Sequence, residues 1–218
     1  MADKVFYFVE GNIGSGKSTV LTFLDPDVFR VVPEPTEDWT RPRDEAGGRS
    51  LLDLFYGSTR EYGFAFQMHV IATRWAQYKA LDPRDPRPVV SERSFVSSME
   101  VFGRGLLEDG SMDPTTFAVY RGFSEEFDDM LRQRFQGYRF EIAYVKTDPE
   151  NCLARVQKRA RDEEHGLTLE YLRAVHERQD AMIERVKKDI RVHTIDGNAG
   201  LDEVRRAALE LFRNPSSS

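Results

Sequence analysis

The sequence predicts an α/β fold, a parallel sheet of five strands with helices on both of its faces. Two observations support this prediction. Short apolar runs rich in β-branched and aromatic residues alternate along the chain with longer segments of helical periodicity. In addition, the first apolar run leads directly into a glycine-rich turn that opens a helix. Strands that alternate with helices form a parallel sheet, because each helix carries the chain back to the same edge.

Each apolar run that ends in a turn or a helical segment is predicted to form a strand. The strands are expected at about 4–9, 28–32, 88–91, 140–146 and 190–195. Helices are expected at roughly 17–24, 50–55, 60–80, 94–107, 113–136, 149–160, 167–187 and 200–213. Asp148, Pro149 and Glu150 indicate a helix start, because they supply a cap, a first-turn proline and an acid at the positive end. Charged residues with proline or glycine mark loops at 41–49 and 82–88.

The glycine-rich turn has the pattern of a phosphate-binding loop. Residues 11–18 read Gly-Asn-Ile-Gly-Ser-Gly-Lys-Ser and match G-x-x-x-x-G-K-[ST] at every fixed position. The glycines let backbone N–H groups surround a polyphosphate, Lys17 reaches its β and γ oxygens, and Ser18 offers a hydroxyl to Mg²⁺. The following helix points its positive end at the same anion. The residues expected to bind it are Gly11, Asn12, Gly14, Ser15, Gly16, Lys17, Ser18 and Thr19.

Length and composition favour one globular domain. The chain has 218 residues, of which 40% are hydrophobic, and the domain is expected over 1–213 with a frayed tail at 214–218. The net charge of −6 argues against a general nucleic-acid surface, and no apolar stretch approaches the ~20 residues of a membrane span. Cys152 is the single cysteine, which excludes an internal disulfide, and the four histidines show no ligand spacing. Since no signal peptide is evident, we expect an intracellular, cytoplasmic protein.

Charged side chains follow the second and third predicted strands. Glu34 stands between two prolines after the second strand, and Glu92 and Arg93 follow the third. A carboxylate after the third strand can hold Mg²⁺ directly or through water, while an arginine beside it can bind a phosphate or the acceptor oxygen. Because ligands of open parallel sheets collect at the carboxyl ends of the strands, we expect these groups at one edge with the phosphate-binding loop.

A cluster of basic residues follows the fourth strand and its helix. Arg155 and Arg159 are four residues apart on one helical face, and Arg161 lies just beyond. Taken alone, such a cluster is typical of a solvated helix face. Beside a phosphate-binding loop it predicts a lid, at about 155–166, that closes over the transferring phosphate and supplies charge to the transition state.

Five stretches of the chain together resemble the deoxyribonucleoside kinases, the relatives of deoxycytidine, deoxyguanosine and mitochondrial thymidine kinases. They are Glu10 to Thr19, Glu34-Pro35 followed by Trp39, Phe66-Gln67, Glu92-Arg93-Ser94, and the basic cluster continued through Glu163-Glu164 to Leu172. The resemblance implies a P-loop kinase fold and transfer of the ATP γ-phosphate to the 5′-hydroxyl of a deoxynucleoside in nucleotide salvage. It also implies Mg²⁺ as cofactor and a homodimer formed through helices near 60–80 and 94–136.

The resemblance also implies roles for individual residues. Glu34 is expected to be the base near the 5′-hydroxyl and Gln67 the amide that faces the nucleobase edge. Glu92 is assigned to Mg²⁺ and Arg93 to the acceptor site. The remaining assignments are Tyr56 and Glu164 to the sugar 3′-hydroxyl, and Arg155, Arg159 and Arg161 to the lid.

The residues of the nucleobase slot leave the base preference open. An amide pairs a donor with an acceptor, which suits a base edge, and Gln67, Val70 and Arg74 fall on one helical face. In the family, members that prefer cytosine or purines pair an arginine at the position of Arg74 with an aspartate at that of Ser98, whereas thymidine-accepting members have small or apolar residues at both. This chain has the arginine without the aspartate. We favour pyrimidines, because the β-branched Val70 narrows the slot.

Three aromatic residues are candidates for the flat walls of this slot. They are Trp39, Phe66 and Phe102, and the alternative is that they are ordinary core aromatics.

Two other functions compete with the deoxynucleoside kinase. A nucleoside monophosphate kinase shares the loop, the sheet and the lid but must bind an acceptor phosphate. A P-loop nucleotide-binding switch would perform no transfer to a small acceptor. The chain lacks the Asn-Lys-x-Asp motif that reads guanine and has charged groups after three further strands, which favours an enzyme.

Overall fold

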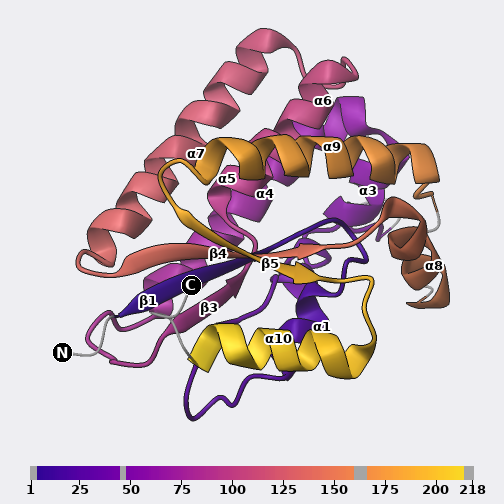
Figure 1. Ribbon diagram of the computed structural model, residues 1–218. Helices are drawn as coiled ribbons and strands as arrows, with labels where there is room; N and C mark the ends of the chain where they lie inside the picture. Colours follow the sequence, from indigo (N-terminus) through magenta and orange to yellow (C-terminus); the bar gives the residue numbers. More distant parts are fainter. Residues whose placement is uncertain (1–3, 45–47, 160–165, 214–218) are drawn as a thin grey trace.

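Five parallel strands form one sheet in the order β2, β3, β1, β4, β5 (Figure 1). The computed structural model of the chain describes residues 4–44, 48–159 and 166–213. The sheet confirms the predicted fold class. The strands are β1 Val5–Glu10, β2 Arg30–Val32, β3 Val89–Glu92, β4 Arg139–Lys146 and β5 Arg191–Asp196.

Helices connect the strands, as the alternating pattern predicts. The short helix α2, which directly follows Pro35, was not among the predicted helices. The helices are α1 Lys17–Thr22, α2 Thr36–Trp39, α3 Leu51–Gly57, α4 Thr59–Ala80, α5 Phe95–Ser97, α6 Arg104–Glu108, α7 Pro114–Arg134, α8 Pro149–Arg159, α9 Leu169–Val186 and α10 Leu201–Arg213, with a π-helical turn η1 at Ser98–Gly103.

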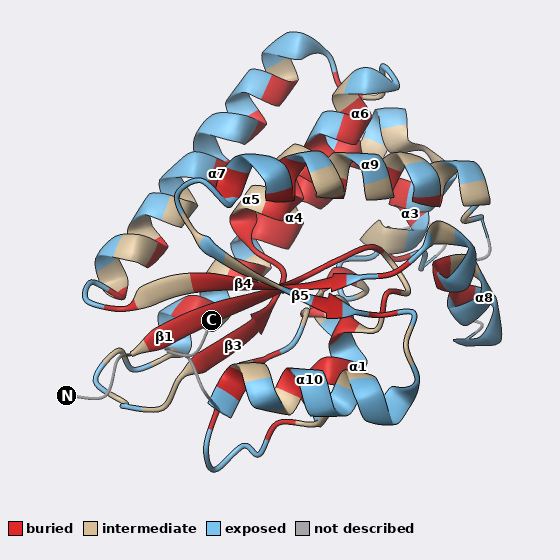
Figure 2. Ribbon diagram, in the orientation of Figure 1, coloured by how far each residue is buried: buried red, intermediate tan, exposed pale blue. Residues whose placement is uncertain are grey.

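Both faces of the sheet are covered by helices, so its central strands are buried (Figure 2). Side chains alternate along β1: Phe6 and Phe8 face one core, and Tyr7 and Val9 face the other. The first core lies beneath α4, α7 and α9, and the second lies against α1 and α10 (Figure 1). The first core is rich in aromatic rings, and Phe6 alone lies 5.2 to 5.5 Å, between ring centroids, from the rings of Tyr78, Phe135 and Phe140.

Two predicted elements differ from those in the structure. The strand expected from residue 28 begins at Arg30, because the backbone N–H groups of Val28 and Phe29 both bond to the carbonyl of Asp25 and form a turn. The helix expected over 94–107 divides into α5, η1 and α6. Its middle turn is a π-helix, a rare form that is frequently found at functional sites and that no propensity pattern reveals.

The loop over 82–88 lies at the amino ends of the strands and is fixed by a buried arginine. Arg30 donates from Nη1 to the carbonyl of Asp82 at 2.5 Å, from Nε to that of Arg87 at 3.1 Å and from Nη2 to the hydroxyl of Tyr138 at 2.9 Å. This guanidinium stands at the start of β2, whereas Glu34 follows the end of the same strand.

Within the described ranges, no helix combines the length and the apolar character needed to cross a membrane. The predicted lid falls partly, and the predicted tail wholly, outside the described residues.

Candidate active site

The carboxyl ends of β1, β2 and β3 meet at one edge of the sheet, where they bring together the phosphate-binding loop and the charged groups predicted to act beside it. The loop joins β1 to α1, Glu34 follows β2, and Glu92 is the last residue of β3. The adjacent pairing of Val9 with Glu92 sets the carboxylate of β3 beside the start of the loop.

The backbone of the phosphate-binding loop needs its glycines. Gly11, Gly14 and Gly16 have φ values of 148°, 77° and 104°, a region that residues with side chains rarely adopt. A Cβ on Gly11 would also stand 2.5 Å from the carbonyl oxygen of Val145, and one on Gly14 would stand 2.6 Å from that of Cys152. The loop can therefore pack against β4 and α8 only with glycine at these positions.

Lys17 is buried at the floor of the site. Its Nζ donates to the carbonyl of Asn12 at 2.8 Å and lies 3.9 Å from Oε1 of Glu92. Burial and the neighbouring charge of Arg93 lower the pKa of Lys17 to about 8, against the opposing effect of Glu92. A phosphate group at the loop would supply negative charge next to this ammonium group and so compensate for its lost hydration.

Ser18 and Glu92 form a pair of oxygen ligands suited to a magnesium ion. The Ser18 hydroxyl donates to both carboxylate oxygens of Glu92, at 3.0 and 3.1 Å. Among the described residues no three His, Cys, Asp or Glu side chains gather to hold a metal ion. The hydroxyl of Ser18 and the carboxylate of Glu92 fit Mg²⁺, which takes one or two protein ligands and completes its shell with substrate phosphates and water.

Glu34 is held between two guanidinium groups. Its Oε1 lies 2.9 Å from Nε of Arg93 and 3.5 Å from Nη2 of Arg74, and its side chain is 18% exposed. Burial alone would favour the neutral acid. The charges of Arg93, Lys17 and Arg74 outweigh it, so the pKa of Glu34 is lowered and the group is a carboxylate at neutral pH.

Arg93 connects three parts of the site. In addition to Glu34, it donates from Nη1 to the carbonyl of Gly11 at 2.9 Å, and its guanidinium stacks on the ring of Phe102 with 4.7 Å to the centroid. Its backbone has φ 64°, the left-handed region in which a residue other than glycine stores about 1–3 kcal/mol of strain. Such strain is found where a side chain must be aimed, here from the end of β3 into the site.

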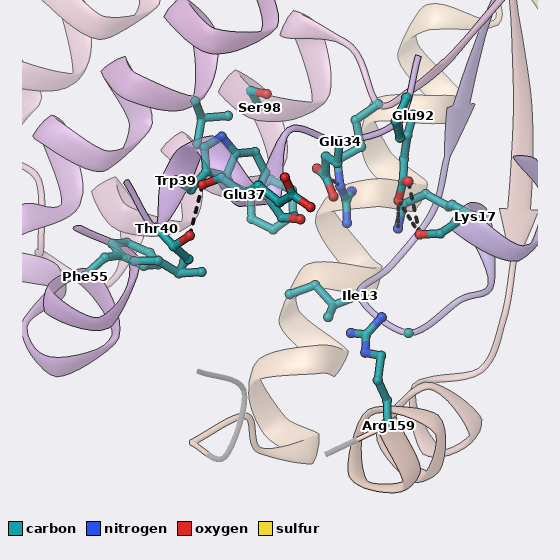
Figure 3. A pocket seen from close by; sticks show the side chains of 18 of the residues that line it. Ile13, Lys17, Glu34, Glu37, Trp39, Thr40, Phe55, Glu92, Ser98 and Arg159 are labelled. Atoms are coloured by element: carbon teal, nitrogen blue, oxygen red, sulfur yellow. Dashed lines mark hydrogen bonds and ion pairs between the residues drawn. The ribbon is translucent and has the colours of Figure 1, made fainter. Parts of the chain in front are cut away.

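A single cavity of about 1010 Å³ joins the phosphate-binding loop to a slot lined by aromatic rings. Lys17 and Glu92 lie at one end, Trp39 and Phe55 at the other, and Glu34 between them (Figure 3). The predicted residues that line it are Gly14, Gly16, Lys17, Ser18, Thr19, Glu34, Trp39, Tyr56, Phe66, Gln67, Val70, Glu92, Arg93, Ser98, Phe102, Arg155 and Arg159.

The aromatic slot is built from α2, α3 and α4. Phe55 and Phe66 stack with 4.4 Å between centroids, and Trp39 meets Phe66 edge-on at 5.7 Å. Gln67 lies beside them, buried, and its Oε1 accepts a hydrogen bond from the hydroxyl of Tyr120 at 3.3 Å. A flat apolar slot with one amide at its wall suits a planar heterocycle with polar edges.

Four of the predicted site residues do not line the cavity. Gly11 and Ser15 lie in the loop behind it, and the Asn12 amide is committed elsewhere: Nδ2 donates to the carbonyl of Leu172 at 2.8 Å and Oδ1 accepts from the backbone of Ile13. Arg74, expected in the nucleobase slot, is fully buried and turned toward Glu34. Two more, Arg161 and Glu164, lie outside the described residues.

The two described arginines of the predicted lid differ in their surroundings. Arg155 donates from Nη1 to the carbonyl of Ser15 at 3.0 Å and from Nη2 to that of Gly197 at 2.7 Å, so it ties the phosphate-binding loop to the turn after β5. Arg159, at the end of α8, lines the cavity near Ile13 (Figure 3).

The cavity also has lining residues that the sequence analysis did not single out. Phe55 and Leu52 come from α3 and lie one helical turn apart. Because Tyr56 on the same helix was predicted to be at the site, this spacing could have identified them. Thr36, Glu37 and Thr40 come with α2, which was not predicted. The full set is Ile13, Pro33, Thr36, Glu37, Thr40, Leu52, Phe55, Lys158 and Tyr171.

The sequence of this chain is similar to those of a known family and of several known proteins. The sequence model of a family described as deoxynucleoside kinase matches residues 7–214. A probable deoxycytidine kinase of Fowlpox virus is 29% identical over 89% of this chain and 78% of its own length. Deoxycytidine kinase 2 of Gallus gallus is 32% identical, over 80% of this chain and 72% of its own length. Mitochondrial thymidine kinase 2 of Homo sapiens is 38% identical, over 77% of this chain and 60% of its own length.

Replacing Lys17 tests the phosphate end of the cavity. Lys17→Ala should bind ATP much more weakly, because a buried ammonium beside the phosphates is lost. At an ATP concentration 100 times the wild-type Kd, the wild type gains about 2.7 kcal/mol of stability, and the variant should lose most of it. Thermal melts with and without ATP measure the gain, and circular dichroism checks the fold. Lys187→Ala, at the exposed end of α9, is the control; a full ATP shift in Lys17→Ala would contradict the assignment.

Proposed function

Since this chain belongs to the deoxynucleoside kinase family, we propose that it transfers the γ-phosphate of ATP to the 5′-hydroxyl of a pyrimidine deoxynucleoside. The kinase activity itself follows from the family. The preference for pyrimidines and the roles of individual residues are the proposal.

The observation that carries the proposal is the placement of Glu34 within the cavity. It lies between the phosphate-binding loop and the aromatic slot, so a nucleoside whose base fills the slot has its sugar beside the carboxylate (Figure 3). A phosphate donor on the loop then faces the 5′-hydroxyl. Transfer between two bound substrates depends above all on this alignment.

The lowered pKa of Glu34 suits a positioning base. In a loose phosphoryl-transfer transition state the acceptor proton leaves late, so a weak base that accepts a hydrogen bond from the hydroxyl is enough to hold it in line. The proton passes to Glu34 as the new P–O bond forms. Arg93, paired with Glu34, supplies positive charge next to the acceptor oxygen.

The slot supports a pyrimidine by its shape and its polar groups. Val70 lies on the wall beside Gln67, and its branched side chain reduces the depth open to a second ring. The base then lies between the rings of Phe66 and Phe102, and the Gln67 amide forms hydrogen bonds with its edge. Ser98, where cytosine-preferring and purine-preferring relatives have an aspartate, adds no charge, which suits a pyrimidine of either kind.

The sugar and the phosphate meet the remaining proposed residues. Tyr56, which lines the cavity, and Glu164 bind the 3′-hydroxyl. Arg159 and Arg161 close over the transferring phosphate, whose charge develops in the transition state. Arg155 contributes mainly by holding the loop, since its guanidinium bonds to the Ser15 and Gly197 carbonyls.

We assign Mg²⁺ to Ser18 and Glu92, because they combine a hydroxyl and a carboxylate at the end of the loop that receives the phosphates. When bound, the ion neutralises charge on the donor phosphates. Glu92 and Ser18 would hold the ion at this end of the loop, and Lys17 would bind oxygens of the donor phosphates.

We also propose that the enzyme is a homodimer inside the cell, in the cytoplasm. Phe64 on α4 and Val119 and Phe123 on α7 are 38 to 48% exposed, and these two helices pack together, so their outer faces offer an apolar surface to a second copy. Sedimentation equilibrium measures the mass directly.

A panel of nucleosides tests the function. With ATP and Mg²⁺, deoxycytidine or thymidine should give the 5′-monophosphate at a higher kcat/KM than deoxyadenosine or deoxyguanosine. Glu34→Gln should lower turnover on the order of 10²- to 10⁴-fold, because the hydroxyl loses its charged partner. Product chromatography measures both, and ATP affinity should stay nearly unchanged.

Three outcomes would contradict parts of the proposal. A purine deoxynucleoside as the best substrate would refute the pyrimidine preference alone. Phosphorylation of nucleoside monophosphates, with nucleosides left unchanged, would refute the choice of acceptor. Near-wild-type turnover of Glu34→Gln, in an assay limited by chemistry, would make Glu34 a structural carboxylate.

Removal of the proposed metal ligand gives a separate test. Glu92→Ala should lower turnover and raise the Mg²⁺ concentration needed for half-maximal rate, because the ion loses its carboxylate, and excess Mg²⁺ should partly restore the rate. Glu37→Ala removes another carboxylate that lines the cavity and serves as the control for charge. An unchanged Mg²⁺ requirement in Glu92→Ala would refute the metal site.

A further inference from the structure

Arg74 is the largest side chain in the chain's described part to be almost completely withdrawn from solvent, with 1% exposure. It comes from the middle of α4, one turn after Val70, and does not line the cavity. A buried guanidinium must be paired with a negative charge and with acceptors, because an unpaired buried charge is strongly destabilising. The groups with which Arg74 forms hydrogen bonds and an ion pair therefore indicate its role.

Those partners are the groups that position the acceptor hydroxyl. Nη1 of Arg74 donates to the backbone carbonyl of Glu92 at 2.5 Å and to that of Arg93 at 3.2 Å. Nη2 lies 3.5 Å from Oε1 of Glu34. One guanidinium thus spans from the end of β3 to the carboxylate that follows β2.

The backbone contact also supports Arg93. Residue 93 has a left-handed backbone, φ 64°, and its carbonyl accepts from both Arg74 and the Tyr78 hydroxyl. These bonds brace the turn from which the Arg93 side chain reaches Glu34 at 2.9 Å. Arg74 consequently acts on Glu34 twice, directly by charge and indirectly through the turn that aims Arg93.

Ser98, which also lines the cavity, offers Arg74 no negative charge on the side of the nucleobase slot. Ser98 is uncharged, and its hydroxyl donates to the carbonyl of Ser94 at 3.1 Å. Gln67, the polar group that does face the slot, bonds to Tyr120 and makes no bond with Arg74 in the described structure. The carboxylate that forms an ion pair with this guanidinium is that of Glu34, at 3.5 Å, and Glu10 adds negative charge nearby.

We propose that Arg74 is a positioning residue for phosphoryl transfer, which holds Glu34 and the Arg93 turn in place and does not read the nucleobase. This inference rests on the proposed role of Glu34 as the partner of the 5′-hydroxyl. It separates this chain from the family members that pair this arginine with an aspartate, because the aspartate is missing here and the arginine forms an ion pair with Glu34.

Arg74→Met is the direct test, since methionine fills much of the volume without the charge or the donors. The variant should lose kcat on the order of 10²-fold, the scale of a misplaced reacting group. The KM for the deoxynucleoside should change little, and the ranking of the four deoxynucleosides by kcat/KM should stay as in the wild type. Initial rates with all four nucleosides measure each quantity.

A double-mutant cycle shows whether the effect passes through Glu34. In the Glu34→Gln background, adding Arg74→Met should lower kcat by clearly less than it does in the wild type, because the carboxylate is already gone and only the Arg93 turn is left to disturb. Two independent sites would instead give the full product of the two single losses.

Arg30→Met is the matched control for the loss of a buried guanidinium. Arg30 is 7% exposed and bonds to two backbone carbonyls and a tyrosine, as a structural arginine does, but at the far end of β2. Its removal should lower the melting temperature and leave kcat per folded molecule near the wild-type value. The amount of folded Arg74→Met is normalised in the same way, by titration of ATP binding.

The outcomes separate the two proposals. A changed nucleoside ranking with kcat retained for the best substrate would overturn the inference and return Arg74 to the base slot. Full additivity in the cycle would also overturn it. If Glu34→Gln alone retains wild-type turnover, the role of Glu34 fails and the inference falls with it, whatever Arg74→Met does.

Discussion

The ion pair between Glu34 and Arg93 is the contact on which the rest of the site depends. The two groups lie 2.9 Å apart, in the cavity that joins the phosphate-binding loop to the aromatic slot. Arg93 also bonds to the carbonyl of Gly11 and stacks on Phe102, so a shift of this pair would disturb the loop and the slot together. Since both charges are largely withdrawn from water, each is stable only while the other is in place. The pair is therefore a constraint on the fold as well as a part of the proposed chemistry.

The parallel sheet makes this arrangement possible. It brings the carboxyl ends of β1, β2 and β3 to one edge, where the cations Lys17, Arg74 and Arg93 lie among the carboxyl groups of Glu10, Glu34 and Glu92. The helices on both faces exclude water from that edge, which strengthens each interaction. One consequence is that the acceptor side is organised before any substrate arrives. Glu10 illustrates this: it is fully buried and fixed by the Ser94 hydroxyl at 2.7 Å, so it supports the turn after β3 without entering the cavity.

Functional residues that belong to a short motif, or that directly follow a strand, could be predicted from the sequence. Residues whose positions depend on packing between distant segments could not. The phosphate-binding loop is one continuous motif, and Glu34, Glu92 and Arg93 follow strands, so their common edge could be inferred from the order of elements. The predicted fold class was confirmed by the sheet, and the predicted family by the match to the family model. The direction of Arg74 could not be inferred, because it depends on an ion pair across 40 residues and on the uncharged Ser98. Nor could Asn12 be placed, since its amide is committed to a carbonyl 160 residues away. Phe55 and the π-helical turn depend likewise on contacts between helices.

The central claim is that Glu34 is an ionised carboxylate held by cations before the substrates bind. The most direct measurement is its pKa in the free enzyme, from the carbon chemical shift of the side-chain carboxyl in protein labelled with ¹³C glutamate, with Glu34→Gln to assign the signal. Burial alone would raise this pKa, whereas Arg93, Lys17 and Arg74 lower it, and the account predicts a pKa below that of an ordinary glutamate. A pKa at or above the ordinary value would mean that the cations do not hold the carboxylate, and it would contradict the account.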